Sequence, residues 1–199
     1  MKDAVQAKTT RDAILDATDR LLARYGYKKM TIDDLASEVG IGKGSIYLHF
    51  SSKEEIALTH IDRIIERLKE NLRVIAAKPI KADERLRRML MERVLYRFDS
   101  VQHYKQSLNE LLAFVRRPLL ERRKRYFEEE AQILASVIKE GQDLSIFAKG
   151  DSFDLALTLV SATNSLLPYS LSAIELGDRD ELASRIEKTA KLLIKGLSR

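Results

Sequence analysis

Apolar residues recur at helical spacing along almost all of this 199-residue chain, and this periodicity limits the folds that it can adopt. No segment sustains the alternation of apolar and polar residues that marks a strand. Three prolines and eight glycines are present, so long helices have few interruptions. The sequence therefore predicts an all-α protein, in which the 45% of hydrophobic residues can form a core.

The stretch from Thr31 to Lys53 predicts two short helices joined by a tight turn. Thr31 can cap the first helix, and Asp34 completes a capping box with it. Gly40 can adopt the left-handed conformation that closes this helix. A second helix is expected over residues 43–50, after Gly42. Such a pair is the form of a helix-turn-helix, whose second helix enters the major groove of DNA.

The outer side of the second predicted helix carries groups that suit nucleic acid. Ile46 and Phe50 are expected to turn inward. The remaining positions present basic, hydroxyl and small residues without a carboxylate: Lys43, Gly44, Ser45, Tyr47 and His49. Groups of this kind bind phosphates and base edges.

The same stretch resembles the DNA-binding motif of a known family. Its residues Thr-Ile-x-Asp-Leu-Ala-x-x-x-Gly-Ile-x-Lys-Gly-Ser-Ile-Tyr-x-His-Phe-x-Ser-Lys-Glu-Glu are similar to those of TetR-type, tetracycline-repressor-like transcriptional regulators. The resemblance implies that DNA is contacted, mostly at its phosphates, by Thr31, Gly42, Lys43, Gly44, Ser45, Tyr47, His49 and Lys53. Two positions depart from the family pattern. Gly42 stands where Ser or Thr is frequent, and Leu48 where polar or aromatic side chains are frequent.

The helix-turn-helix is expected to form a domain with one helix before it. That helix begins at a Thr10 cap, after a loose arm of residues 1–9, and ends at Gly26. The resulting three-helix DNA-binding domain covers residues 1–52. Residues 53–199 are expected to form a larger helical domain for effector binding and dimerisation, as the resemblance implies.

The larger domain is predicted to be a succession of helices. The expected signals are, in order, a capping box at Ser52 and Glu55, an end near Ala77, a cap at Asp83, a break at Pro118, and an end at Gly141 before a loop to Ser152. The charged run of residues 116–130 is typical of a solvated helix face and, less often, of a second nucleic-acid site.

Residues 155–174 carry no charge, but their hydroxyl groups and Pro168 make a membrane span unfavourable. A helix uncharged on all sides is buried on all sides, so one side is expected to face a second copy of the chain. The last helix, residues 180–197, offers an apolar stripe of Leu182, Ile186, Ala190, Leu193 and Leu197. The resemblance also implies a homodimer, because TetR-type proteins pair their last two long helices in a four-helix bundle.

A set of apolar, aromatic and amide residues on the middle and later helices can be ordinary core or can line a ligand pocket. The set is Met89, Phe98, Leu108, Leu112, Tyr126, Phe127, Asn164 and Tyr169. The resemblance implies a pocket, since TetR-type proteins bind small molecules among these helices. The expected effector is an apolar or aromatic molecule with at least one hydrogen-bonding group, for which Asn164 is a candidate partner.

Other classes of function lack support in the sequence. The chain has no cysteine, and its histidines, His49, His60 and His103, lie on separate expected segments without the spacing of a helical metal site. The glycines of the turn match no phosphate-binding loop. No nucleophile stands beside a base. No enzymatic activity, metal or cofactor is therefore expected.

The sequence thus predicts a homodimeric, ligand-responsive transcriptional regulator, most often a repressor in the family that it resembles, with a palindromic operator as its DNA partner. The formal charge of +5 favours acidic partners but is mild. The amino terminus has no signal-peptide core, so a cytoplasmic location without a membrane partner is expected. The alternative is a helical small-molecule-binding module, or an enzyme of the same fold, that does not regulate transcription.

Overall fold

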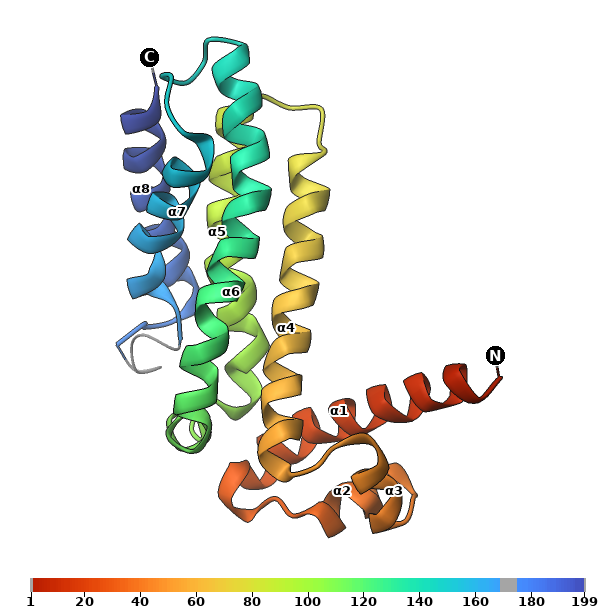
Figure 1. Cartoon of the computed structure of the whole chain (residues 1–199). Coiled ribbons are helices and arrows are strands. Elements are labelled where there is room, and N and C mark those ends of the chain that lie inside the picture. The colour runs from red at the N-terminus through yellow and green to blue at the C-terminus, as the bar shows by residue number, and fades with distance from the viewer. Residues whose placement is uncertain (1, 169–174, 199) are drawn as a thin grey trace. The chain divides into compact units, whose positions relative to one another are not determined.

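The computed structural model describes residues 2–168 and 175–198, and every regular element in this part of the chain is a helix (Figure 1). The α-helices are α1 (Lys2–Lys29), α2 (Ile32–Val39), α3 (Lys43–His49), α4 (Lys53–Ala76), α5 (Ala82–Val101), α6 (Leu108–Asp143), α7 (Ser152–Ala162) and α8 (Arg179–Leu197). Two short 3₁₀ helices are η1 (Gln102–Tyr104) and η2 (Asn164–Leu166). The predicted all-α fold is confirmed.

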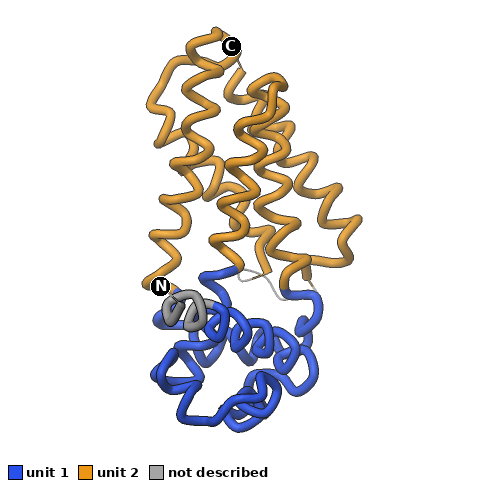
Figure 2. Tube along the Cα trace, turned by 90° about the vertical axis from the view of Figure 1, so that its right-hand side faces the viewer, with its two compact units in different colours: residues 1–63, 101–119 blue, residues 64–100, 120–199 orange. Residues whose placement is uncertain are grey.

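The chain divides into two compact units, which Figure 2 colours separately. Unit 1 comprises residues 1–63 and 101–119, and unit 2 comprises residues 64–100 and 120–199. The division differs from the predicted boundary between residues 52 and 53, because the first turns of α4 and the segment around η1 group with the helix-turn-helix. As a boundary between DNA-binding and effector-binding functions, residues 52 and 53 stay a prediction.

Unit 1 is held together by the apolar side of α1. Ile14, Leu21 and Leu22 are at most 2% exposed, and α1 packs against α2, where Leu35 is fully buried. Gly26 interrupts α1 with a φ of 73° and a ψ of 168°, as the sequence predicts, and one more helical turn follows it. A glycine is needed at this break because L side chains rarely adopt this φ.

The start of α1 corrects one prediction. The helix begins at Lys2 and not at a Thr10 cap, so the loose arm of residues 1–9 is wrong. Residues 2–9 contain no proline or glycine that would stop a helix. The hydroxyl of Thr10 is therefore not needed to start α1.

Unit 2 has its own core, to which the later part of α4 and the helices α5 to α8 contribute. Leu86, Met89, Leu90 and Val94 are fully buried along α5, on the stripe that helical spacing predicts. Each such side chain stabilises the fold by roughly 1.5–3 kcal/mol relative to an exposed one. Opposite them, the cluster includes Leu134, Ile138, Leu159, Leu182 and Ile186.

The predicted break at Pro118 is wrong, because α6 continues through this proline. The real interruption lies earlier, at residues 102–107, where η1 and a turn separate α5 from α6. A proline inside a helix costs about 3 kcal/mol. Residues before and after Pro118 are buried, such as Val115 at 0% and Tyr126 at 4% exposure. Their burial stabilises a continuous helix and offsets this cost.

The uncharged segment is shorter and less buried than predicted. α7 ends at Ala162, and Thr158, Ser161 and Ala162 are exposed, so the prediction of one helix buried on all sides over residues 155–174 is wrong. Residues 169–174 lie outside the described part. Over residues 2–168 and 175–198, no helix combines the length and apolarity that a membrane span requires.

α8 begins with a capping box formed by Asp178 and Glu181. Its buried stripe includes Ile194, whereas Leu193 is only partly buried against the core of unit 2 and Leu192 is 72% exposed. The predicted stripe is therefore corrected at one position. An α-helix has 3.6 residues per turn, so a stripe that starts at Leu182 and Ile186 can continue at residue 194 as readily as at residue 193.

Candidate nucleic-acid interface

The turn between α2 and α3 is built as the sequence predicts. The Thr31 hydroxyl accepts a hydrogen bond of 3.1 Å from the Asp34 backbone N–H, and the Asp34 carboxylate accepts one of 2.9 Å from the Thr31 N–H. Gly40 closes α2 in the left-handed region at a φ of 75°, and the N–H of Ile41 donates to the carbonyl of Ala36 over 3.0 Å. These bonds fix the angle at which the chain enters α3.

α3 turns one side into unit 1 and leaves the other in solvent. Ile46 and Phe50 are at most 2% exposed and anchor it, as predicted. On the open side, Tyr47 is 49% and Leu48 is 84% exposed. Gly42, Lys43 and Gly44 are also exposed, whereas Ser45 and His49 are half-buried. The predicted DNA-binding residues from Gly42 to His49 thus lie on one short helix and the residue before it.

Two glycines of this surface have no role in the packing of the protein. Gly42 precedes α3 with an ordinary φ of −71° and no side-chain cap, and Gly44 lies within the helix. A Cβ atom built on either residue would meet no heavy atom within 4 Å. A glycine in an exposed helix lowers its stability by about 1 kcal/mol relative to alanine. The packing of the chain gives no compensating reason for Gly44.

Charge on this surface is only partly balanced. The Lys43 ammonium lies 2.8 Å from the Asp33 carboxylate, and this hydrogen bond raises the pKa of Lys43. Both side chains are more than half exposed, so the pair is weak and a phosphate can compete for the lysine. The Asp34 carboxylate remains in the capping box, where the Thr31 side-chain bond, followed by the backbone bond, lowers its pKa.

Lys53 has an internal role in this structure. Its ammonium donates to the carbonyls of Tyr27 and Met30, both over 3.0 Å, and lies 4.5 Å from the centre of the Tyr27 ring. Partial burial lowers the pKa of Lys53. The first residue of α4 thus holds the end of α1. Its expected contact with DNA stays a prediction and would have to share the ammonium with these carbonyls.

Arg11 was not among the sequence-based candidates. Its guanidinium donates to the carbonyl of His49 over 3.0 Å and lies 4.4 Å from the centre of the Phe50 ring. It therefore ties α1 to the end of α3. Its position three residues before the buried Ile14 was the signal that could have placed it beside the motif.

The structure divides the predicted ligand residues between the two units. Leu108 and Leu112 lie in unit 1, the described others lie in unit 2, and Tyr169 lies outside the described residues. Met89 and Phe98 are at most 2% exposed within the core of unit 2. Their role in binding a ligand stays a prediction.

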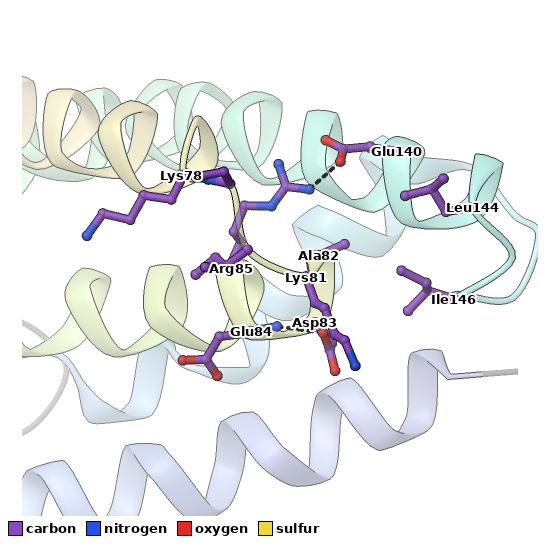
Figure 3. Close-up of a pocket in the computed structure, with 11 residues that line it drawn as sticks. Lys78, Lys81, Ala82, Asp83, Glu84, Arg85, Glu140, Leu144 and Ile146 are labelled. Atoms are coloured by element: carbon purple, nitrogen blue, oxygen red, sulfur yellow. Dashed lines mark hydrogen bonds and ion pairs between the residues drawn. The ribbon is translucent and has the colours of Figure 1, made fainter.

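Two grooves of unit 2 contain none of these predicted residues. One, of about 830 Å³, lies between the start of α5 and the end of α6 and is lined in part by Lys81, Arg85, Glu140 and Ile146 (Figure 3). Arg85 donates there to Glu140 and, over 2.8 Å, to the carbonyl of Ala76. The other groove, of about 290 Å³, lies along α4 and α5. Among the described residues, no group of His, Asp or Glu could hold a metal ion.

The fold and the exposed α3 define a class of proteins: all-α chains with a helix-turn-helix before a larger helical region. Residues 14–59 match the profile of the family described as bacterial regulatory proteins, tetR family. The uncharacterized HTH-type transcriptional regulator YerO of Bacillus subtilis is 27% identical over 200 residues, which cover 95% of this chain and 66% of that protein. An uncharacterized HTH-type transcriptional regulator of Lactococcus lactis is 37% identical over 59 residues, 30% of each chain.

The same fold is found in a solved structure. A transcriptional regulator from Cytophaga hutchinsonii superposes with a TM-score of 0.77 at 24% identity, over 94% of this chain and 98% of that chain. The match of residues 14–59 to this family confirms the resemblance seen in the motif, and the solved structure shows the same fold. This family consists of regulators rather than enzymes. The chain spans less than two thirds of the length of the two curated relatives.

Proposed function

We propose that this chain is a DNA-binding transcriptional regulator whose α3 enters the major groove of an operator. The observation that carries the proposal is the open side of α3, where Lys43, Gly44 and Tyr47 are exposed and no carboxylate of the helix accompanies them. Its TetR-type motif supports the same function. The regulator is proposed to be a cytoplasmic repressor that a small apolar or aromatic effector releases from DNA.

Each exposed group suits a different part of the DNA. Lys43 and Tyr47 can bind phosphates and hold the helix in position, while Ser45 can reach a base edge. Leu48 suits the methyl group of thymine, which is the apolar feature of the major groove. Gly44, which the packing of the protein does not require, allows the backbone of α3 to approach the DNA closely.

A homodimer is part of the proposal. After Asp154 in its first turn, α7 exposes the small uncharged residues Thr158, Ser161 and Ala162, and α8 exposes Leu192. These two elements are the last α-helices of the described chain, as in the four-helix bundle of TetR-type dimers. A dimer would present two copies of α3 to half-sites about 34–36 Å or a multiple apart, so the operator should be nearly palindromic.

The role of Gly44 provides a sharp test. Gly44→Ala should make the free protein slightly more stable, because the new methyl group meets open space and alanine is the better helix former by about 1 kcal/mol. The same methyl group should weaken operator binding by about tenfold or more, because one lost contact costs about 1–3 kcal/mol. Fluorescence anisotropy with DNA from the upstream region of the gene measures the affinity.

Ser136→Ala, at an exposed position of α6 in unit 2, is the matched control. It should preserve operator affinity while also favouring helix. Binding of the unaltered protein should weaken steeply as salt is raised, because phosphate contacts release counterions. Failure to bind the upstream DNA at low salt, or equal operator affinities for Gly44→Ala and the unaltered protein, would refute this placement of DNA on α3.

A further inference from the structure

Unit 2 buries more positive than negative charge at one place. Arg93 and Arg97 of α5 and Glu130 of α6 are at most 1% exposed. The Nε of Arg93 donates to Glu130 over 2.7 Å, and Arg97 donates to both oxygens of the same carboxylate. We call these three residues the arginine cluster. Two guanidinium groups thus share one carboxylate.

The pKa values of Arg93 and Glu130 leave both groups charged at neutral pH. Burial, with the positive charges of Arg97 and Arg123, lowers the pKa of Arg93 to about 10 against the opposing effect of Glu130. Burial alone would raise the pKa of Glu130, but the two arginines hold it below its ordinary value. The cluster therefore carries one positive charge that no buried carboxylate of its own neutralises. Charges in the interior are normally paired, because removing an ion from water is costly.

The unbalanced charge has a definite direction. The two terminal nitrogens of Arg93 donate to neutral oxygens, Nη1 to the Thr163 hydroxyl over 2.8 Å and Nη2 to the Asn164 amide oxygen over 2.6 Å. This edge of a guanidinium matches the two oxygens of a carboxylate. A carboxylate also attracts the guanidinium through its opposite charge, which a hydroxyl or an amide oxygen does not provide. A carboxylate would therefore replace neutral acceptors with stronger, charged ones.

Two further residues make this end of the cluster suitable for a ligand. Arg93, Glu130 and Thr163 are buried, whereas Asn164, the acceptor of Nη2, is partly exposed, so a ligand would approach Arg93 from the side of Asn164. The half-buried ring of Phe127 has its centre 5.3 Å from the Arg93 guanidinium carbon and 5.0 Å from that of Arg123. An apolar ring or chain beside a carboxylate would meet Phe127 there.

We propose that the outer edge of Arg93 binds the carboxylate of a small organic acid, whose apolar part packs against Phe127. The acid displaces the Asn164 amide oxygen from Nη2 and supplies the negative charge that the arginine cluster lacks. The proposal rests on the proposed function for its meaning in regulation, since it assigns the effector to the class of amphipathic organic acids. The binding itself can be measured without DNA.

The test compares acids with amides of the same shape. Octanoate with octanamide, and phenylacetate with phenylacetamide, are titrated into the full-length protein and followed by calorimetry. At least one acid should bind about tenfold or more tightly than its amide, the ratio that 1.4 kcal/mol produces. Arg93→Met should abolish this preference, because it removes the excess positive charge of the cluster and leaves the pair of Arg97 and Glu130. Arg67→Met, which removes an exposed guanidinium of α4, should retain it.

A second variant guards against a fold effect of Arg93→Met. Asn164→Ala keeps all three charges and removes the neutral acceptor that the acid displaces, so acid binding should be equal or tighter. The proposal is overturned if no acid is preferred to its amide, if the preference survives in Arg93→Met, or if Asn164→Ala abolishes it. Failure of the protein to bind its upstream DNA would refute the proposed function and leave these titrations unaffected.

Discussion

Replacing Glu130 with Gln removes the negative charge of the arginine cluster and leaves two buried guanidinium groups. Glu130 is fully buried and accepts hydrogen bonds from both arginines, so nothing else in the cluster can compensate. Removing one partner of a buried ion pair costs about 3–5 kcal/mol. In a chain of this size each kcal/mol lowers the melting temperature by about 2–4 °C, so Glu130→Gln should melt roughly 6–20 °C lower.

Replacing one of the arginines should not produce this loss of stability. Arg93→Met leaves one guanidinium with one carboxylate, so the free energy of unfolding should change by less than about 1.5 kcal/mol or should increase. Urea denaturation followed by circular dichroism measures both variants, with the exposed Arg67→Met as a control. A cost below about 1 kcal/mol for Glu130→Gln, or equal costs for Glu130→Gln and Arg93→Met, would refute the charge imbalance.

Two other perturbations test separate surfaces. Glu84 accepts hydrogen bonds from Arg87 and Arg88, which lower its pKa to about 2. Its contribution to stability is therefore present above the ordinary pKa of about 4.3 and is lost as the pH falls through about 2. Glu84→Gln should be less stable than the unaltered chain at pH 7 in urea titrations, and a gap that stays constant down to pH 2 would contradict this assignment. Leu192→Glu should convert the proposed dimer to monomers, which sedimentation measures. Replacing Leu193 with Glu should instead lower the stability of the fold, because Leu193 contacts the core of unit 2. A dimer that is unchanged in Leu192→Glu would place the interface elsewhere.

The parts of the fold that depend on neighbouring residues were predictable from the sequence. The capping box follows from the spacing of Thr31 and Asp34, and the left-handed conformation follows from the glycine at position 40. Ile46 and Phe50 follow from helical spacing in the same way. These signals are local, so they identify the helix-turn-helix without knowledge of the rest of the chain.

The wrong predictions concern places where contacts between residues far apart in the sequence determine the structure. Pro118 carries the local signal of a helix end, but burial on both sides keeps α6 continuous. The choice between Leu193 and Ile194 depends on the rotation of α8 against the core of unit 2, which the spacing of a single helix does not determine. Tertiary packing overrides local preference in both cases.

The arginine cluster shows a third kind of limit. Charged residues are almost never fully buried unless they are paired, so the charge of Arg93 and Arg97 argues against burial at both positions. Both positions nevertheless lie on the buried side of α5, beside Val94 and Phe98. This coincidence with the apolar stripe was a signal, but their partner Glu130 lies on a different helix and could not be inferred.

Pro118 also has a consequence for how α6 opens to solvent. Proline lacks a backbone N–H, so the carbonyl of Phe114 has no helical partner at this point. Close to it, the chain passes from unit 1, which ends at Leu119, into unit 2. Amide hydrogens at residues 108–117 should therefore exchange at rates governed by the local unfolding of unit 1, and those at residues 120–143 at rates governed by unit 2. A helix with a continuous backbone would thus belong to two cooperative regions.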